Sequence, residues 1–564
     1  MTHSFSRRSF LKGGVLSAAA AALTLPADAA SPDAVSPIST LCSTRFGAVQ
    51  GIPKDSHLVW YGIPYGAAPV GDARWSAPLD PAFWTSPLDC TSPAPVAYQF
   101  STCPIGSEDC LRLDVYSVPT AQNRPVLVYL HGGNNQTGDS LELPGDELVE
   151  TADCVFVSVN YRLGLFGFNC LPALCSGSEA TGNFTLLDIA KALDWVRDNI
   201  AAFGGDPANI TLSGFSAGGR DVMACLTSPL FADRFQKAIS FSGGITFADE
   251  NASARQIAAA LAPFAVEDGR FADENSAFDW LLTPDASVRE WLYSVEPSRL
   301  CSRMTNAAIR MSSFPHLYPD DVVLPKAGFT SGTLNRVPLL LLTGSDEFSA
   351  TAFSDGWFTS EAAQPYSAAE LTAAKKFASR YGSEFYRRFN AEASAEIIAP
   401  LSAAPVYLCQ VEYGSENSRT PLSPLGSFHG ICLPMLSRES SFRLSADFTA
   451  AGYQAMAEQF RTYLKHFLAC GDPNGKENDR RSSLPFWSAW TPDARQTMVL
   501  DADASSAYSE VRDVSVSEDA ILAAMDADNT LSSSLKTAVI RNILNGRWFS
   551  KPIDEHYQNP SLWK

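Results

Sequence analysis

Basic residues are scarce in this sequence of 564 residues, in which 42 Lys and Arg stand against 61 Asp and Glu. The formal net charge is −19, and such an acidic surface repels phosphate groups, so we expect no nucleic-acid partner and no anionic membrane surface as partner. Hydrophobic residues make up 46% and charged residues 18%. This ordinary balance excludes a disordered or collagen-like chain and predicts a globular protein.

Motifs that hold common cofactors and metals are also missing. The sequence has no P-loop, no dinucleotide-binding fingerprint and no H-E-x-x-H zinc motif. Its 12 cysteines are irregularly spaced, without a Cys-x-x-Cys pair or the spacing of a zinc site. We therefore expect no cofactor and no metal.

Residues 1–30 have the features of a twin-arginine export signal. Arg7 and Arg8 are followed by the apolar run 15–25, which is too short to span a bilayer, and then by the small-x-small pattern Ala27-Asp28-Ala29. A receptor reads such a leader, which is not a stable membrane anchor. We expect the Tat export machinery as a partner, a periplasmic or secreted bacterial protein, and a single domain over residues 31–564.

Export would permit disulfides among the cysteines. Cys90, Cys103 and Cys110 lie close together in the sequence, as do Cys170 and Cys175. Disulfides are therefore expected, but the spacing does not choose the pairs.

Short apolar runs alternate with helical patterns along the rest of the chain. The runs are continuous rather than alternating with polar residues, which indicates strands buried on both faces of a sheet. Residues 186–202 carry apolar side chains at steps of three and four, as an amphipathic helix does. The alternation predicts an α/β fold with a large, mostly parallel sheet flanked by helices. The clearest predicted strands are 126–130, 154–159, 210–212, 337–343 and 406–413.

Gly214-Phe215-Ser216-Ala217-Gly218 is a G-x-S-x-G sequence between a short predicted strand and a predicted helix at 218–226. This strand–turn–helix setting is the one in which a nucleophile elbow exposes a serine hydroxyl. A glycine-rich turn without chemistry is the competing interpretation. The setting favours Ser216 as a nucleophile.

A nucleophilic serine needs a base within hydrogen-bond reach and a carboxylate that orients the base. Among the 7 histidines, His429 lies in a glycine-flanked loop, 426–430, beyond the strand 406–413. Asp346 and Glu347 follow the leucine-rich strand, between Ser216 and His429, in the chain order that elbow enzymes use. Spacing alone does not choose between the two carboxylates.

His131-Gly132-Gly133-Asn134 follows another predicted strand. The tetrahedral intermediate of acyl transfer carries a negative oxygen, which preorganised N–H groups stabilise. Glycine lets the backbone approach closely and aim such groups. We expect an oxyanion hole from the backbone N–H groups of Gly133, Asn134 and Ala217, and a loop turn without this role is the alternative.

Several further sequence blocks are similar to those of one enzyme family. With the elbow, they make the chain resemble a type-B carboxylesterase, of the cholinesterase-like branch of the α/β hydrolases, from about Arg45 to Asn474. The blocks are Tyr61-Gly62-Ile63-Pro64-Tyr65, Ser107-Glu108-Asp109-Cys110-Leu111, Asn160-Tyr161-Arg162-Leu163-Gly164, Phe203-Gly204-Gly205-Asp206-Pro207 and Gly471-Asp472-Pro473-Asn474.

The resemblance implies the α/β-hydrolase fold, with long insertions, here about 247–315 and 348–381, forming the pocket. It implies Ser216 as nucleophile, His429 as base and Glu347 as acid, because the acid of the family is the second residue of the Asp-Glu pair. It also implies the oxyanion hole of Gly133, Asn134 and Ala217. The reaction would be acyl transfer from an ester through an acyl-enzyme to water.

The chain departs from the family pattern at several positions. Phe215 replaces the usual glutamate before the serine, which makes the pocket more apolar, and Asn134 replaces the third glycine of the oxyanion run. Ala97 replaces a half-cystine, so the resemblance implies a first disulfide re-paired through Cys90 or Cys103. Residues 99–108 lack the Trp with which cholinesterases bind choline, so we expect no cholinesterase activity.

We therefore expect a carboxylic ester hydrolase for small to medium, apolar or aromatic small-molecule esters. Two alternatives are a lipase, and a binding protein on the same scaffold, because the family includes adhesion proteins that have lost catalysis. The presence of Ser216, Glu347 and His429 together favours the enzyme.

Overall fold

The computed structural model describes residues 37–175, 181–303, 309–310, 315–422, 424–441, 448–476 and 484–559. The chain divides into two compact units, Met1–Pro37 and Ile38–Lys564. The predicted leader, residues 1–30, lies outside the described residues, so it stays a prediction. No helix in the described ranges combines the length and apolarity that a membrane crossing requires.

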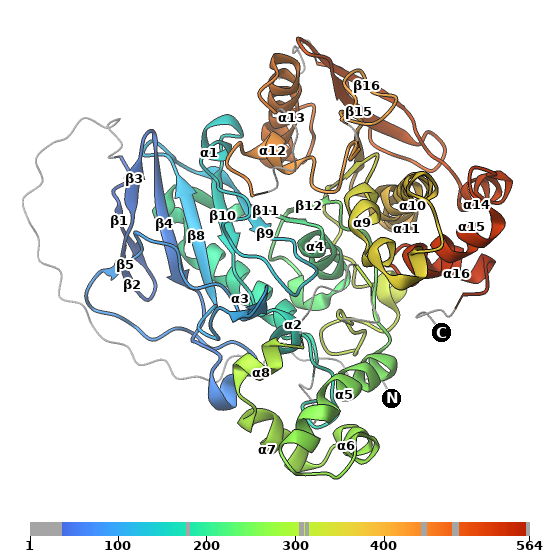
Figure 1. The fold of residues 1–564 in the computed structure, drawn as a ribbon. Helices are drawn as coiled ribbons and strands as arrows, with labels where there is room; N and C mark the ends of the chain where they lie inside the picture. Colours follow the sequence, from blue (N-terminus) through green and yellow to red (C-terminus); the bar gives the residue numbers. More distant parts are fainter. Residues whose placement is uncertain are drawn as a thin grey trace, which may run out of the picture. The chain divides into compact units, whose positions relative to one another are not determined.

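An eleven-stranded sheet runs through the second unit, in the order β16-β15-β14-β13-β12-β11-β9-β10-β8-β4-β3 (Figure 1). Its seven central strands are parallel and mostly buried, and five of them match the continuous apolar runs predicted from the sequence. The parallel strands are β9 (Arg124–Leu130), β10 (Val155–Val159), β11 (Gly205–Phe215), β12 (Lys237–Phe241), β13 (Leu339–Gly344), β14 (Val406–Val411) and β15 (Gln496–Ala502).

Antiparallel strands extend the sheet at both edges. One edge is β16, which pairs with β15, and the other is the series from β8 to β3. Beside the large sheet, β1, β2 and β5 form a three-stranded sheet, and β6 and β7 a hairpin. The bounds are β1 (Leu41–Thr44), β2 (Gly47–Gln50), β3 (Ile52–Lys54), β4 (His57–Pro64), β5 (Leu88–Asp89), β6 (Gln99–Phe100), β7 (Pro104–Ile105), β8 (Arg112–Ser117) and β16 (Ala507–Asp513).

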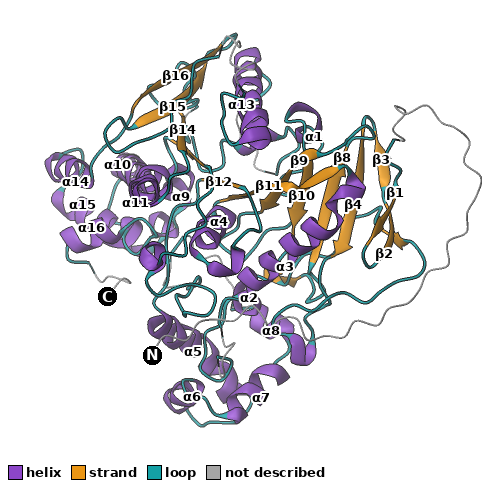
Figure 2. Ribbon diagram, turned by 180° about the vertical axis from the view of Figure 1, so that it is seen from behind, coloured by secondary structure: helices purple, strands orange, loops and turns teal. Residues whose placement is uncertain are grey.

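Helices flank the sheet, and α3 (Phe184–Asn199) lies in front of the strands in Figure 2. Its apolar stripe faces inward, with Leu186, Ile189, Leu193 and Val196 buried, as their spacing predicts. The other helices near the sheet are α1 (Leu148–Thr151), α2 (Gly164–Gly167), α4 (Ala217–Thr227), α12 (Leu433–Leu436) and α13 (Ala451–Cys470). The α/β-hydrolase fold expected from the sequence is confirmed.

The two insertions carry most of the remaining helices. The insertion at 247–315 holds α5 (Glu250–Glu267), α6 (Glu274–Leu281), α7 (Ala286–Ser294) and α8 (Pro297–Cys301), which lie together in both ribbon views (Figures 1 and 2). The insertion at 348–381 holds α9 (Ser349–Ser354) and most of α10 (Ala368–Arg387). The C-terminal helices α14 (Glu518–Ala527), α15 (Ser533–Val539) and α16 (Lys551–His556), with α11 (Ala393–Ile398), complete the set.

A second hydrophobic core joins α9 and α10 to the C-terminal helices. It includes Phe348, Phe377 and Tyr386 together with Ile543 and Phe549. The segment that follows α15 therefore packs against residues that directly follow the predicted acid at position 347.

All twelve cysteines lie within the described residues, and all are thiols. Cys90 and Cys110 are buried, and Cys103 is exposed. Burial raises the pKa of Cys90 to about 12, which keeps it protonated at neutral pH. The structure does not support the disulfides expected from the sequence, including the re-pairing through Cys90 or Cys103.

Candidate active site

Ser216 stands on the sharp turn between β11 and α4, with a φ of 54° and a ψ of −113°. The turn is possible because its glycines carry no side chain: a Cβ on Gly214 would lie 2.4 Å from the carbonyl oxygen of Gly218. A Cβ on Gly218 would lie 2.2 Å from the carbonyl oxygen of Leu130. The strand–turn–helix setting predicted from the G-x-S-x-G sequence is confirmed, and Ser216 lies at its tip with 6% of its surface exposed.

The structure brings Ser216, His429 and Glu347 into one chain of hydrogen bonds. His429 Nε2 lies 2.9 Å from Ser216 Oγ, and His429 Nδ1 lies 2.5 Å from Glu347 Oε2. Ser216 follows β11 and Glu347 follows β13, so both come from the carboxyl ends of parallel strands, where active groups of open α/β sheets gather. A hydroxyl, an imidazole and a carboxylate in this order can activate the hydroxyl for nucleophilic attack.

Glu347 is fully buried, and both oxygens of its carboxylate are hydrogen-bonded. Its Oε1 accepts hydrogen bonds from the Gly344 N–H at 2.6 Å, the Ser242 hydroxyl at 2.6 Å and the Thr343 hydroxyl at 3.0 Å. These donors leave only Oε2 for the imidazole. The carboxylate is therefore fixed in orientation, which in turn fixes the ring of His429.

Asp346, the other carboxylate that the sequence offered, points away from the imidazole. Its Oδ2 accepts hydrogen bonds from the Ser427 N–H at 3.0 Å and the Ser345 hydroxyl at 2.9 Å. The Asp346 N–H also donates to the Ser427 carbonyl at 3.0 Å. Asp346 thus anchors the loop that presents His429, whereas Glu347 contacts the ring itself.

Two aromatic rings pack on the imidazole of His429. Phe215 lies 4.7 Å from it between ring centroids, and Tyr386 lies 5.3 Å from it at an interplanar angle of 23°. Both rings are buried. The apolar surroundings that Phe215 predicts are therefore present on the imidazole itself.

The loop after β9 adopts the left-handed backbone that its sequence allows. Gly133 has a φ of 97° and Asn134 a φ of 60°. A Cβ on Gly133 would lie 2.1 Å from the Thr137 carbonyl oxygen, so this position requires glycine. Asn134 occupies the left-handed region without a glycine, as its short polar side chain permits.

Glu142 is hydrogen-bonded to the start of the same loop. Its Oε1 accepts hydrogen bonds from the Gly132 N–H and the Tyr129 hydroxyl, both at 2.7 Å. Burial raises the pKa of Glu142 to about 7, and these two hydrogen bonds oppose the rise. The position of the loop before Gly133 thus depends on a buried carboxyl group.

We expect Glu142 to make the folded protein less stable as the pH rises from 5 to 8. The folded state holds the Glu142 proton more tightly than the unfolded chain does, so the stabilisation present at low pH is lost as the pH passes about 7. Glu142→Gln mimics the protonated acid and removes this loss. Urea unfolding should show the variant gaining up to about 3 kcal/mol on the wild type between pH 5 and pH 8. An equal difference in the free energy of unfolding at both pH values would contradict this role.

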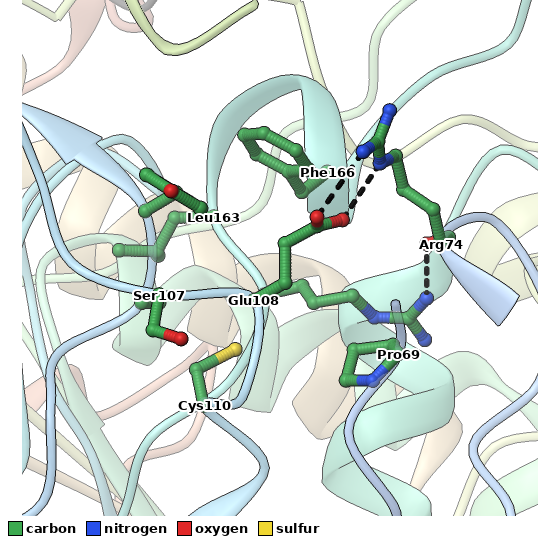
Figure 3. Close-up of a pocket in the computed structure, with 10 residues that line it drawn as sticks. Pro69, Arg74, Ser107, Glu108, Cys110, Leu163 and Phe166 are labelled. Carbon is green, nitrogen blue, oxygen red and sulfur yellow. Dashed lines mark hydrogen bonds and ion pairs between the residues drawn. The ribbon is translucent and has the colours of Figure 1, made fainter. Parts of the chain in front are cut away.

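Figure 3 shows a small cavity whose lining includes residues of two blocks that carry the family resemblance, 107–111 and 160–164. Arg74 Nε lies 2.7 Å from Glu108 Oε1 across it, and the guanidinium of Arg162, on the same cavity, pairs with buried Asp188. Ser216, His429 and Glu347 do not line it. These blocks therefore build buried ion pairs that hold the loops beside the sheet. In the described ranges, no group of three or more His, Cys, Asp and Glu side chains is placed to hold a metal ion.

The sequence model of the carboxylesterase family matches residues 38–355. The chain belongs to the carboxylesterase family. It is a carboxylic ester hydrolase, as the resemblance implied.

Two relatives illustrate how far the similarity of this carboxylesterase extends. It is 29% identical to the para-nitrobenzyl esterase of Bacillus subtilis (strain 168) over 495 residues, which cover 82% of this chain and 95% of that protein. It is 34% identical to the juvenile hormone esterase of Tribolium castaneum over 336 residues, 56% of each chain.

Solved structures agree with these relatives. A para-nitrobenzyl esterase structure superimposes with a TM-score of 0.65 at 26% identity, covering 84% of this chain and 97% of that one. A carboxylesterase of Geobacillus stearothermophilus gives a TM-score of 0.64 at 25% identity, covering 84% and 98%.

Some residues of this candidate site were not predicted from the sequence. Ser242 directly follows β12, a strand that the sequence analysis missed, and the rule that active groups follow parallel strands could have found it. Tyr386 lies inside α10, and no motif marks it. Glu142 lies in a loop, and its role depends on contacts that spacing does not reveal.

Proposed function

We propose that this carboxylesterase is a serine esterase in which Ser216 is the nucleophile, His429 the general base and Glu347 the orienting acid. The observation that carries the proposal is the unbroken chain of hydrogen bonds from Ser216 Oγ through the imidazole to the buried Glu347 carboxylate. Family membership supports the same chemistry.

In this mechanism Ser216 Oγ attacks the ester carbonyl while His429 Nε2 takes its proton. The Glu347 carboxylate keeps the proton on Nδ1 and stabilises the imidazolium that forms. His429 then gives the proton to the departing alcohol, which leaves an acyl-enzyme. Water, activated by the same imidazole, releases the acid and restores the serine.

We further propose that the N–H groups of Gly133, Asn134 and Ala217 form the oxyanion hole. Within the described part of the chain, none of the three donates to a protein acceptor, so each can serve a substrate oxygen. Gly133 and Asn134 have the left-handed backbone of a tight loop, and Ala217 opens α4 directly after Ser216. A Cβ on Gly218 would touch the His131 carbonyl at 2.6 Å, so this loop and the start of α4 are in close contact.

The substrates we propose are small to medium esters with apolar or aromatic groups. The rings of Phe215 and Tyr386 on His429 support this class, because they surround the reacting atoms with apolar surface. The Bacillus subtilis relative is named as a para-nitrobenzyl esterase, which agrees with an aromatic ester. We also propose that residues 1–30 are a leader that directs export of the protein to the periplasm or the medium.

The test is pre-steady-state hydrolysis of a short series of p-nitrophenyl esters by the wild-type protein. We expect a burst of p-nitrophenol equal to the enzyme concentration, followed by slower turnover, because the acyl-enzyme forms faster than water removes it. Mass spectrometry of acid-quenched enzyme should find the acyl group on the peptide that contains Ser216. Turnover without acylation of that peptide would contradict the mechanism, and a preference for charged aliphatic esters would contradict the substrate class.

A further inference from the structure

Tyr386 is a buried side chain whose hydroxyl has no evident use in the fold. Its ring stacks on His429 and, at 5.1 Å and 29°, on Phe549. The residue is 1% exposed, yet within the described residues its hydroxyl has no hydrogen bond of normal geometry. Leaving a buried hydroxyl unsatisfied destabilises the fold, so such a group calls for an explanation.

Ser216 Oγ is one contact away from this side chain, because Tyr386 stacks on His429 and His429 Nε2 lies 2.9 Å from Ser216 Oγ. The Ser216 side chain is close enough to lower the pKa of Tyr386, although burial, the main cause, raises that pKa. His429 Nε2 approaches the same oxygen at 2.9 Å. Because the Ser216 hydroxyl donates its proton to the imidazole, the lone pairs of Oγ are left to accept a hydrogen bond from the tyrosine.

Arg220 is a buried cation whose charge acts on Tyr386. It lies in the first turn of α4, where its N–H donates to the Ser216 carbonyl at 3.0 Å. Its guanidinium is 1% exposed, lies 3.0 Å over the Trp548 ring, and has no hydrogen-bond partner in the ranges that the structure describes. Burial lowers the pKa of Arg220 to about 9, so the group is still cationic at neutral pH.

Two consecutive aromatic residues, Trp548 and Phe549, contact these two groups. Trp548 carries Arg220 on its face, and the adjacent Phe549 stacks on Tyr386. The Glu347 carboxylate raises the pKa of Tyr386, whereas the charge of Arg220 lowers that pKa and so favours the hydroxyl as a donor. Tyr386 thus contacts His429, the partner of Ser216, and Arg220 is linked to Tyr386 through the consecutive residues Trp548 and Phe549.

We propose that Tyr386 is a further catalytic residue, whose hydroxyl donates a hydrogen bond to Ser216 Oγ whenever that atom gains negative charge, with Arg220 polarising the hydroxyl. The inference rests on the proposed role of Ser216 as nucleophile. A hydrogen bond that is loose in the free enzyme and tightens in the transition state is common for catalytic groups.

The tyrosine would act twice in one turnover without losing its proton. During attack, the Oγ–H bond breaks toward His429 and the Oγ–carbon bond forms, and the hydroxyl stabilises the charge on Oγ between these events. During hydrolysis of the acyl-enzyme, the Oγ–carbon bond breaks, and the hydroxyl supports Oγ as the leaving group until His429 returns the proton. Both effects lower the barrier by electrostatic stabilisation of a developing charge.

A structural explanation would assign only the ring of Tyr386 a role, as packing for His429. Tyr386→Phe separates the two, because phenylalanine keeps the ring stacks and removes the hydroxyl. We expect kcat for a p-nitrophenyl ester to fall about 10- to 100-fold with KM changed less than about threefold. The second-order rate at which a dialkyl p-nitrophenyl phosphate blocks Ser216 should fall by a similar factor, because that reaction needs the nucleophile and no deacylation.

Tyr116→Phe is the matched control. Tyr116 lies on β8, is 1% exposed, and also has a buried hydroxyl without a hydrogen bond of normal geometry in the described part of the chain. The substitution removes the phenolic hydroxyl, as Tyr386→Phe does, but from an equally buried ring outside the candidate active site. We expect kcat and the rate of inactivation by the phosphate to stay within about twofold of wild type, a much smaller change than the loss expected for Tyr386→Phe.

Arg220→Met provides a second variant if Tyr386→Phe proves unstable. It should lower both rates in the wild-type background and have little further effect beside Tyr386→Phe, because it acts through the hydroxyl. Rates for Tyr386→Phe within twofold of wild type would overturn the inference while the Ser216 mechanism stands. Loss of the wild-type burst, or activity retained by Ser216→Ala, would instead overturn the proposed function.

Discussion

Replacing Ser216 with alanine should lower kcat for a p-nitrophenyl ester by about 10⁶-fold, to the residual rate that binding and the oxyanion hole alone provide. The variant keeps the backbone of the elbow, since the turn depends on the glycines around it rather than on the hydroxyl. It loses the only hydroxyl in hydrogen-bond contact with His429 Nε2 in the described part of the chain. Steady-state hydrolysis and the burst both measure the effect.

Ser213→Ala is the matched control for this loss. Ser213 lies on the same strand, β11, and its buried hydroxyl donates to the Val128 carbonyl at 2.8 Å. We expect turnover by Ser213→Ala within a few-fold of wild type and a modest loss of stability of about 1 kcal/mol. Similar turnover by Ser216→Ala and Ser213→Ala would show that the hydrolysis does not use the elbow serine.

Replacing Glu347 with glutamine should lower kcat by about 10⁴-fold, because the exchange forces the wrong tautomer on His429. Oε1 accepts from the backbone N–H of Gly344, which cannot reverse its direction, so the glutamine oxygen must stay at that position. The glutamine NH₂ then faces His429 Nδ1. An imidazole that accepts at Nδ1 carries its proton on Nε2 and cannot take the proton of Ser216.

Asp346→Asn is the control that separates the two neighbouring carboxylates. The asparagine oxygen can still accept from the Ser427 N–H, so the loop that carries His429 is kept. We expect a loss of less than about tenfold, because no charge next to the imidazole changes. Comparable losses in Asp346→Asn and Glu347→Gln, measured as kcat on one ester, would contradict the assignment of Glu347.

Ser216 and His429 could be predicted from the sequence because local signals mark them. Two glycines that must carry no side chain frame Ser216, and a glycine-flanked loop after a strand presents His429. Asp346 and Glu347 could not be told apart by spacing, since both follow β13 and only their side-chain directions differ. The family resemblance chose Glu347, the carboxylate that the structure places against the imidazole.

Five of the seven parallel strands could be predicted from a local signal of the same kind. Continuous apolar runs such as those of β9 and β13 are buried on both faces. β12, Lys237-Ala238-Ile239-Ser240-Phe241, was missed because polar residues interrupt its apolar pattern. The antiparallel strands β4 and β8 and the parallel strand β15 were also missed.

Tyr386, Arg220 and Trp548 could not be found by any local pattern. Tyr386 and Arg220 look like ordinary residues of their helices, and only the packing of a distant segment joins them. The disulfides expected from the cysteine clusters fail for a related reason. Closeness in sequence does not place two thiols at the distance and angle that a bond requires.

The contact of Trp548 and Phe549 with the site bears on the order in which the protein becomes active during its synthesis. A ribosome delivers the elbow, the strands around it and His429 long before it delivers these two aromatic residues. A nascent chain can therefore fold its sheet and bring Ser216 to His429 while Arg220 and Tyr386 still lack the rings that hold them. The surroundings of the nucleophile are completed last, so maturation of the site follows closure of the C-terminal helices rather than formation of the sheet.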